Sequence, residues 1–187
     1  MKLAFRLIPL VLAVLLPAAA VRTAGAQEAP VAHPAGPAAP AAAPADVESI
    51  DAIIAALYDV ISGPAGGRDW DRFRSLFAPG AVLSSMVPRP DGTTPLRVFG
   101  VEDFVQRSGA FLQENPFFER ESGRGLQRFG NIANAMSAYE SRRSPEDPEP
   151  FTRGINTITL VTDGTRWYLV SIAWDEVREG NPLPDWF

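Results

Sequence analysis

The sequence contains no cysteine, one histidine and one lysine among its 187 residues. Without cysteine there can be no disulfide, no thiolate zinc site and no lipid anchor on a cysteine. The histidine, His33, lies in an Ala- and Pro-rich segment that precedes the predicted domain. The domain therefore has no imidazole to serve as general base, proton shuttle or metal ligand. We expect no metal and no cofactor, and a fold that its apolar core alone stabilises.

Cations are also scarce in the part of the chain that we expect to fold. The whole chain has 17 Lys and Arg against 22 Asp and Glu, and Lys2, Arg6 and Arg22 all lie in the first 26 residues, which contain no acid. The remainder has 14 arginines against 22 acids, a net charge of −8 with His33 neutral. This charge disfavours nucleic-acid binding, which requires a basic surface to replace counterions.

The first 26 residues have the pattern of a secretory signal peptide. Lys2 and Arg6 precede an apolar run over 7–20, and Ala24-Gly25-Ala26 is the small-x-small pattern of a cleavage site. The run of about 14 residues is shorter than the roughly 20 that a membrane-spanning helix needs. We therefore predict a cleaved signal, no stable membrane anchor and a periplasmic or secreted protein; the alternative is an uncleaved signal anchor.

Residues 27–45 consist almost entirely of Ala, Pro, Val and Gly. Such a segment lacks the large apolar side chains that would offset the entropy of ordering it. We predict a disordered linker here, followed by one domain over 46–187, a length typical of a single domain.

Three helices are predicted in the domain. Apolar residues at steps of three and four predict a first helix over 46–61, with Asp46 as N-cap and a stop at Ser62-Gly63-Pro64. A second helix begins at Asp69 and is ended by Pro79-Gly80. The third covers 101–114.

The remaining segments are predicted as strands. Residues 81–87 and 94–99 form a Pro-containing hairpin that belongs at a sheet edge, and 117–126 is a strand weakened by Gly123 and Gly125. Long strands follow over 127–142, 151–162 and 165–177, the last two joined at Asp163-Gly164. This order predicts an α+β fold: a cone-shaped, curved antiparallel sheet with the three N-terminal helices packed on its concave face.

The last strand is apolar on both predicted faces. Strict alternation puts Trp167 and Leu169 on one face, and Tyr168, Val170, Ile172 and Trp174 on the other. An antiparallel sheet that faces water on one side would alternate more cleanly. We therefore predict that one face lines the interior and the other packs on a second copy, giving a homodimer through the outer sheet face.

Three segments carry a resemblance to a known superfamily: DWDRFRSLFAPGAVL, RFGNIANAMSAYES and DGTRWYLVSIAWDE. With the order of elements around them they resemble the nuclear transport factor 2-like superfamily, in particular its bacterial SnoaL-like members. That superfamily includes ketosteroid isomerase-like, dehydratase, epoxide hydrolase and polyketide cyclase enzymes, and also non-catalytic binding and dimerisation modules. The resemblance implies the fold and leaves the function open.

The catalytic residues of the isomerase-like members are not all present. Alignment with those enzymes places Ser85 where they have an aspartate base, and the stretch 156–159 has no acid where they have a second one. Only Tyr58 matches, at the position of an oxyanion donor. We therefore expect a binder of a small apolar molecule that has no acid–base set. The alternatives are an enzyme acting on a cyclic or polyketide-like substrate, with Tyr58 and two asparagines stabilising an enolate, and a structural dimerisation module.

Ten residues are candidates for lining the pocket of the cone. Four are polar, and each has a structural alternative: Asn134 and Asn156 as buried amides bonded to the backbone, Tyr58 as a boundary residue, and Arg153 as a surface partner of Glu140. Asn134 is expected to be enclosed, because Ile132 and Met136 share its strand face. The apolar candidates, whose alternative is plain core, are Trp70, Phe73, Met86, Phe104, Phe111 and Trp174.

Overall fold

The computed structural model describes residues 40–89 and 91–187. The predicted signal peptide and most of the predicted linker lie outside these residues. The helices are α1 (Pro44–Val47), α2 (Ile50–Ile61), α3 (Trp70–Ser75) and α4 (Val101–Glu114). The strands are β1 (Phe77–Ser85), β2 (Arg97–Gly100), β3 (Phe118–Phe129), β4 (Ile132–Arg142), β5 (Thr152–Thr162) and β6 (Trp167–Glu176).

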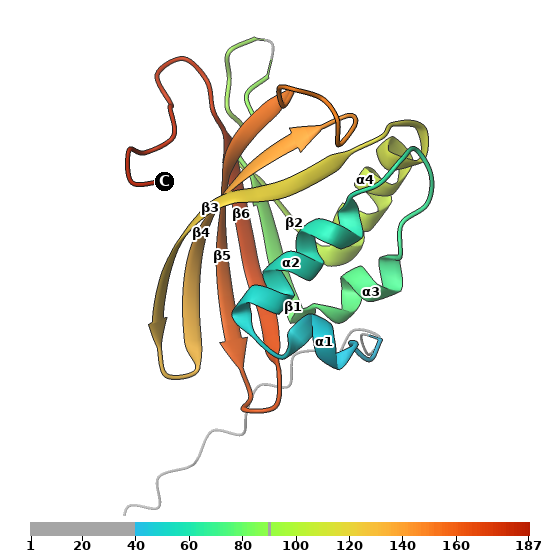
Figure 1. Ribbon diagram of the computed structural model, residues 1–187, viewed down its shortest axis with the longest axis vertical. Helices are drawn as coiled ribbons and strands as arrows, with labels where there is room; N and C mark the ends of the chain where they lie inside the picture. The colour runs from blue at the N-terminus through green and yellow to red at the C-terminus, as the bar shows by residue number, and fades with distance from the viewer. Residues whose placement is uncertain (1–39, 90) are drawn as a thin grey trace, which may run out of the picture. The chain divides into compact units, whose positions relative to one another are not determined.

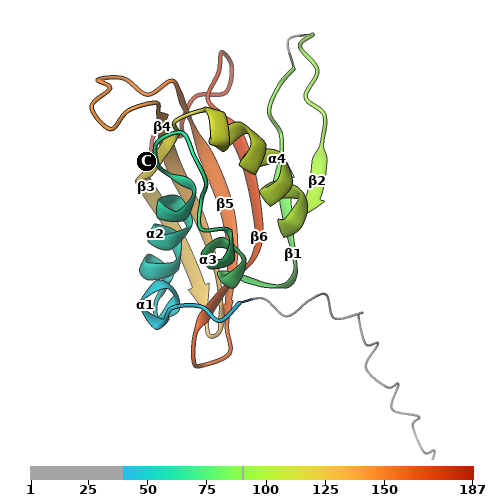
Figure 2. The ribbon, with the colours of Figure 1, turned by 90° about the vertical axis from the view of Figure 1, so that its right-hand side faces the viewer.

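All six strands form one curved sheet in the order β2-β1-β6-β5-β4-β3 (Figure 1). Every neighbouring pair is antiparallel except β1 and β6, which are parallel. The four helices lie on one face, the concave one (Figure 2). The predicted α+β class and the curved sheet with helices on its concave face are confirmed. No helix in the described residues is long and apolar enough to cross a membrane.

The first predicted helix is interrupted. The side chain of Ser49 accepts a hydrogen bond from the Ala52 amide at 3.0 Å, and the Ser49 backbone is extended, so α2 begins after it. Asp46, the predicted N-cap, instead forms an ion pair with Arg72 of α3 at 2.8 Å. A single short turn, α1, therefore precedes α2. The interruption leaves the apolar stripe of α2 facing the sheet.

The boundary predicted between the strands over 117–126 and 127–142 is wrong, because the chain reverses a few residues later, at 130–131. Gly130 and Asn131 form a two-residue turn between β3 and β4, with Phe129 paired to Ile132. Gly130 has φ +55°, a left-handed conformation that glycine adopts without steric cost. The wall of the sheet therefore has four long strands where three were predicted.

The alternation of β6 is also broken, by a bulge. Leu160 pairs with Leu169 and Thr159 with Ser171, so Val170 is an extra residue in β6. The bulge turns Ile172 and Trp174 to the same face as Leu169. The prediction that they lie on the opposite face is wrong, and the outer face of β6 is less apolar than strict alternation implies.

The core lies between α2 and the inner face of the sheet. Ile53, Ile54, Phe73, Leu160 and Leu169 have no exposed surface. On β4 the inward residues are Ala133, Ala135, Ser137, Tyr139 and Ser141. The core thus fills one end of the concave face, and a cavity remains at the other.

Candidate functional site

A cavity of about 260 Å³ opens among α2, α4 and the inner face of the sheet. Its volume is close to the lower end of ordinary small-molecule sites. Much of its surface is aromatic or aliphatic, and polar groups gather where β3, β4, β5 and β6 meet. The apolar lining residues are Leu57, Ile61, Phe73, Leu83, Phe104, Phe111, Leu112, Phe117, Phe151, Ile172 and Trp174.

The aromatic wall is built by edge and face contacts between rings. Phe73 stacks on Phe104 with ring centroids 5.0 Å apart, and Phe104 meets Trp174 edge-on at 6.3 Å. Trp70 lies behind this pair, edge-on to Phe73 at 5.7 Å, and does not line the cavity. Such contacts stabilise ring orientations beyond simple burial. The wall is therefore held in place before any ligand binds.

Tyr58 belongs to a chain of hydrogen bonds that the protein completes by itself. Asn156 Nδ2 donates to the Tyr58 hydroxyl at 3.0 Å, and that hydroxyl lies 2.7 Å from Ser137 Oγ. Ser137 Oγ in turn donates to Glu121 Oε1 at 2.5 Å. The Ser137 proton is thus used, so Tyr58 must donate to Ser137. Burial raises the pKa of the Tyr58 hydroxyl far above its ordinary value, and the group stays neutral.

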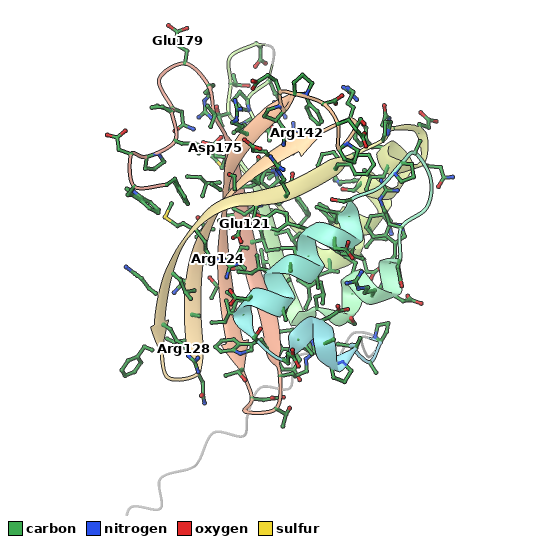
Figure 3. The ribbon with its side chains drawn as sticks, in the orientation of Figure 1. Glu121, Arg124, Arg128, Arg142, Asp175 and Glu179 are labelled. Atoms are coloured by element: carbon green, nitrogen blue, oxygen red, sulfur yellow. The ribbon has the colours of Figure 1, made fainter. Side chains whose placement is uncertain are left out.

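The chain continues to the outside of the sheet edge. Arg124 pairs with Glu121 at 2.6 Å and also with Asp51 of α2 (Figure 3). These pairs hold β3 against α2 and fix the carboxylate that accepts the Ser137 proton. Because its one hydroxyl proton is used in the bond to Ser137, Tyr58 is a poor candidate for stabilising an enolate; one of the two Asn156 N–H donors is likewise used, in the bond to Tyr58.

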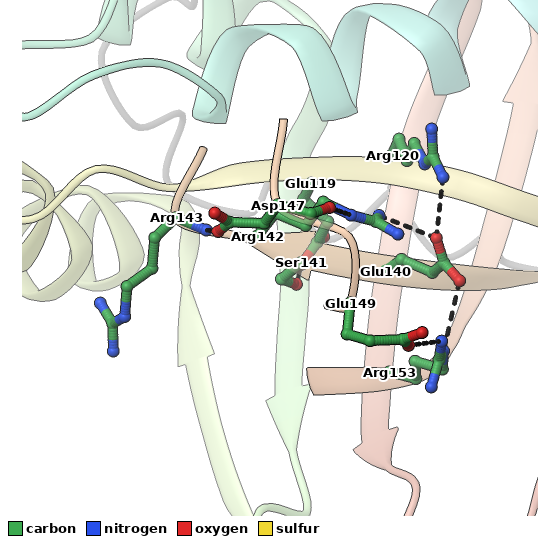
Figure 4. Close-up of polar contacts among 9 residues, drawn as sticks. All are labelled: Glu119, Arg120, Glu140, Ser141, Arg142, Arg143, Asp147, Glu149 and Arg153. Carbon is green, nitrogen blue, oxygen red and sulfur yellow. Dashed lines mark hydrogen bonds and ion pairs between the residues drawn. The ribbon is translucent and has the colours of Figure 1, made fainter. Parts of the chain in front are cut away.

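A second polar group, with few protein partners, occupies the other end of the cavity. Glu119 Oε2 accepts a hydrogen bond from Ser141 Oγ at 2.7 Å (Figure 4). Neither Glu119 nor Glu176 forms an ion pair within the described residues. The pKa of Glu119 is raised to about 7: burial raises it most, the hydrogen bond from Ser141 partly offsets this, and the charge of Glu176 adds a smaller increase. Burial and then the charge of Asp175 raise the pKa of Glu176.

Tyr139 lies between these two acids. Its residue is 4% exposed and lines the cavity, and its hydroxyl forms no hydrogen bond among the residues that the structure describes. Burial, followed by the nearby carboxylates, raises the pKa of the Tyr139 hydroxyl well above its ordinary value. A neutral, unpartnered hydroxyl therefore faces the cavity.

Sheet register explains why these groups meet. Glu119 is opposite Ser141, and the row across the sheet from Tyr139 passes through Gly154 to Glu176. A Cβ at Gly154 would collide with the Tyr139 hydroxyl and with the Asp175 carbonyl oxygen. Glycine at this position thus leaves room for the Tyr139 side chain beneath the cavity.

The end of α2 positions the first residues of β3. Ser62 Oγ donates to the Tyr58 carbonyl oxygen at 2.7 Å and accepts from the Glu119 amide at 2.9 Å. Gly63 and Phe117 exchange two backbone hydrogen bonds. The helix end and the strand therefore fix where Glu119 enters the cavity.

The structure brings six of the ten candidate residues together on the cavity: Tyr58, Phe73, Phe104, Phe111, Asn156 and Trp174. Met86 does not line it; the residue is half-buried beyond the end of β1, and its amide donates to the Trp174 carbonyl oxygen at 3.0 Å. Whether the six contact a ligand stays a prediction.

Asn134 and Arg153 both lie outside the cavity. Asn134 is exposed on the outer face and accepts a hydrogen bond from Thr159 Oγ1 at 3.0 Å, so the expectation that it is enclosed is wrong. Its neighbour Ile132 is half-exposed, because the inward set of β4 is the odd-numbered one. Arg153 pairs with Glu140 at 3.2 Å and Glu149 at 3.1 Å on the surface, which was its structural alternative (Figure 4).

The sequence analysis missed Glu119, Tyr139 and Glu176, which line the cavity, and its expectation of a binder without an acid–base set stays a prediction. A signal for Glu119 was present, since alternation along FFERE puts Phe117, Glu119 and Glu121 on one face. No sequence signal links Glu119 to Glu176, whose strands are not neighbours in the sheet. Among the described residues no group of three or more acids or histidines could hold a metal ion.

No family model matches the chain, and no curated protein matches it either. Solved structures do. One is a protein of unknown function with a cystatin-like fold from Nostoc punctiforme, 16% identical, with a TM-score of 0.53 over 68% of this chain and 88% of that one. Another, from Streptomyces avermitilis, is described as a dehydratase of the nuclear transport factor 2-like family; it is 15% identical, with a TM-score of 0.52 over 71% and 96%.

A third is a nuclear transport factor 2-like protein of unknown function from Pseudomonas putida KT2440. It is 12% identical, with a TM-score of 0.51 over 67% of this chain and 82% of that one. Together these similarities show that the chain has the nuclear transport factor 2-like, cystatin-like fold that the sequence resemblance implied. At such identities they give the fold and no specific activity.

Proposed function

We propose that the cavity binds a small, largely apolar molecule that carries one polar group. The observation that supports this most directly is the unpartnered Tyr139 hydroxyl at one end of an aromatic-walled cavity of about 260 Å³. The hydroxyl oxygen is open to the cavity, since the described residues include no buried polar side-chain atom that lacks a partner. A ligand can hydrogen-bond to it while its apolar body contacts Phe104 and Trp174.

A thermal-shift screen tests the proposal, because a ligand that binds only the folded state raises the melting temperature. Ring compounds of one or two rings that bear an alcohol, ketone or amine should shift it. Replacement of Leu57 at the cavity by Trp fills the space and should abolish the shift. Leu96→Ala is the control, since Leu96 is 68% exposed and does not line the cavity. If no compound of this class raises the melting temperature of the wild-type protein, the cavity is not a binding site for this class and a structural dimerisation module becomes the favoured function.

A second candidate function is acid–base catalysis, which the raised pKa of Glu119 favours. A group with a pKa of about 7 can both accept and donate a proton at neutral pH. In this scheme the Glu119 carboxylate takes a proton from carbon next to a carbonyl, and the Tyr139 hydroxyl donates a hydrogen bond to the developing oxyanion. Glu119 and Tyr139 are not the residues expected from the sequence, which were Tyr58 and two asparagines as groups that stabilise an enolate.

Deuterium exchange separates this candidate from binding alone. Cyclic ketones that shift the melting temperature are incubated with the protein in D₂O, and loss of the proton next to the carbonyl is followed by NMR. Catalysis should disappear in Glu119→Gln, whereas Glu179→Gln, on the exposed C-terminal segment, should retain it. If every ketone that binds exchanges its proton only at the uncatalysed rate, the catalytic candidate is refuted and binding remains as the proposed role.

We also propose that the mature chain is exported and forms a homodimer. Support for export comes from the signal-like pattern of the first 26 residues. Support for a dimer comes from the large apolar side chains that β3 and β4 expose on the outer face: Phe129 at 84%, Ile132 at 50% and Met136 at 37%. Sedimentation of 27–187 at micromolar concentration should give a dimer, and Ile132→Asp should give a monomer; a monomeric wild type would remove the dimer.

A further inference from the structure

Outside the cavity, partly buried acids form ion pairs with arginine. Glu140 is the clearest case: Arg120, Arg142 and Arg153 approach its carboxylate at 3.1, 2.8 and 3.2 Å (Figure 4). Hydrogen bonds from these arginines, Arg142 first, lower the pKa of Glu140 to about 2. Arginines therefore neutralise the Glu140 carboxylate through direct ion pairs.

The two cavity acids are treated differently. No Arg, Lys or His lines the cavity. Arg120, next to Glu119 in sequence, pairs with Glu140 instead. Arg178, the arginine nearest to Glu176 in sequence, donates to both Asp175 carboxylate oxygens at 2.6 and 3.1 Å and to the Glu176 carbonyl oxygen at 2.9 Å, and forms no hydrogen bond with the Glu176 carboxylate. Burial of a carboxylate without a cation is strongly unfavourable. The arrangement therefore has an unfilled place for a positive charge.

The surrounding groups favour a cation over a polar neutral group. Aromatic side chains, among them Phe104 and Trp174, line the cavity, and aromatic rings attract cations. The titratable groups that face Glu119 are Glu176 from β6, Tyr139 from β4 and Tyr58 from α2, while α4 contributes only Ser108 among polar residues. None of these can supply positive charge.

Tyr139 adds a second and independent indication that a ligand occupies this place. The residue is 4% exposed, and its hydroxyl is open to the cavity and has no hydrogen-bond partner among the described residues; it lies in the sheet row that ends at Glu176. A hydroxyl oxygen can accept one N–H of an ammonium group whose other N–H bonds go to carboxylates. Three acceptors line one cavity, and a primary ammonium has three N–H donors.

We propose that the ligand is a protonated amine with a hydrocarbon or aromatic body, whose ammonium group binds Glu119, Glu176 and the Tyr139 hydroxyl. This inference rests on the binding role proposed above and names the chemical class of the ligand. Binding of the ammonium stabilises the ionised form of Glu119, so the protein releases a proton when it binds near neutral pH. Amine affinity consequently rises as pH increases through about 7 and stops rising once Glu119 is ionised in the free protein. Anionic ligands are excluded by the same two carboxylates.

The test uses matched probes that differ in the polar group alone: benzylamine and naphthylmethylamine, the corresponding alcohols, and the corresponding carboxylates. Isothermal titration of the wild-type protein at about pH 8 should give amines at least about tenfold tighter than alcohols and no binding of carboxylates. Glu119→Gln and Glu176→Gln should each weaken amines about tenfold or more and leave the alcohols unchanged. Glu119→Asp, which retains the charge, should keep part of the amine preference, and Glu179→Gln all of it.

The outcomes distinguish this inference from the proposed function. If alcohols bind the wild-type protein as tightly as amines, or if both glutamine variants bind amines as tightly as the wild type does, the amine assignment is overturned and the binding role stands. If no probe of any class binds, the binding role fails and the amine assignment fails with it. Circular dichroism checks that each variant is folded. If one glutamine variant does not fold, the other is compared with the wild type in its place.

Discussion

Replacing Glu119 by Gln should change how the stability of the protein depends on pH. In the folded state the pKa of Glu119 is about 7, against an ordinary value of 4.5. Between these values the folded protein holds a proton that the unfolded chain has already released. The contribution of Glu119 to the free energy of unfolding is therefore fully present below about pH 4.5 and is lost as pH rises through 7. At 1.36 kcal/mol per pH unit the loss is about 3 kcal/mol.

Gln cannot ionise, so the variant lacks this loss. Relative to wild type, the free energy of unfolding of Glu119→Gln should rise by up to about 3 kcal/mol between about pH 4.5 and pH 8. Glu119 is half-buried, so solvent screens part of its charge and this value is an upper bound. Other acids contribute equally to both proteins and cancel in the difference.

Urea denaturation followed by tryptophan fluorescence measures the difference at each pH. Glu179→Gln, which removes an exposed carboxylate, is the control for the loss of one charge. A difference between Glu119→Gln and wild type that stays constant across this pH range would refute the reasoning. It would mean that Glu119 is already solvated or paired in the folded protein.

Two further substitutions test the supports of the cavity. Gly154→Ala should lower the free energy of unfolding by about 1–3 kcal/mol, because its Cβ collides with the Tyr139 hydroxyl and with backbone; Gly67→Ala, whose Cβ meets nothing closer than 4.0 Å, should change urea stability far less. Ser137→Ala should lower it by about 1–3 kcal/mol, because it leaves the buried Tyr58 hydroxyl without an acceptor. In a double-mutant cycle with Tyr58→Phe much of that loss should vanish, and strict additivity would contradict the hydrogen-bond chain.

The binding and catalytic proposals use the same two groups in different ways. In the binding role, Glu119 contributes a negative charge and Tyr139 a hydrogen bond, and the ligand dissociates without having reacted. For catalysis, Glu119 must also return the proton that it takes, which a pKa of about 7 permits. A tightly bound ammonium would hold Glu119 ionised and so prevent it from acting as a proton donor. Amines should therefore inhibit any exchange of ketone protons.

Local periodicity was enough to predict much of the fold. The apolar stripe over 101–114 matches α4, and the alternation over 151–162 matches β5 closely. These segments follow simple periods because each buries one face against a single layer. The order of the predicted helices and strands along the chain was enough to predict a curved antiparallel sheet covered by helices.

The errors fall where a single residue interrupts the period. Gly130 reverses the chain inside an otherwise regular alternation, and the extra residue Val170 turns the rest of β6 over. A bulge has no composition signal, since its effect appears only when the strand is aligned with its neighbours. The placement of Trp174 on the cavity and of Asn134 outside it depended on such details.

The sequence by itself determined the class of fold, the positions of most helices and strands, and the absence of thiol and imidazole chemistry from the domain. Only the tertiary structure decided that Glu119 and Glu176 share one cavity with Tyr139. The physical reason is that chain periodicity records which face a residue occupies, whereas strand order and register determine which residues meet on that face. Burial then shifts the pKa of the acids, and that shift exists only once the sheet and α2 have excluded water from around them.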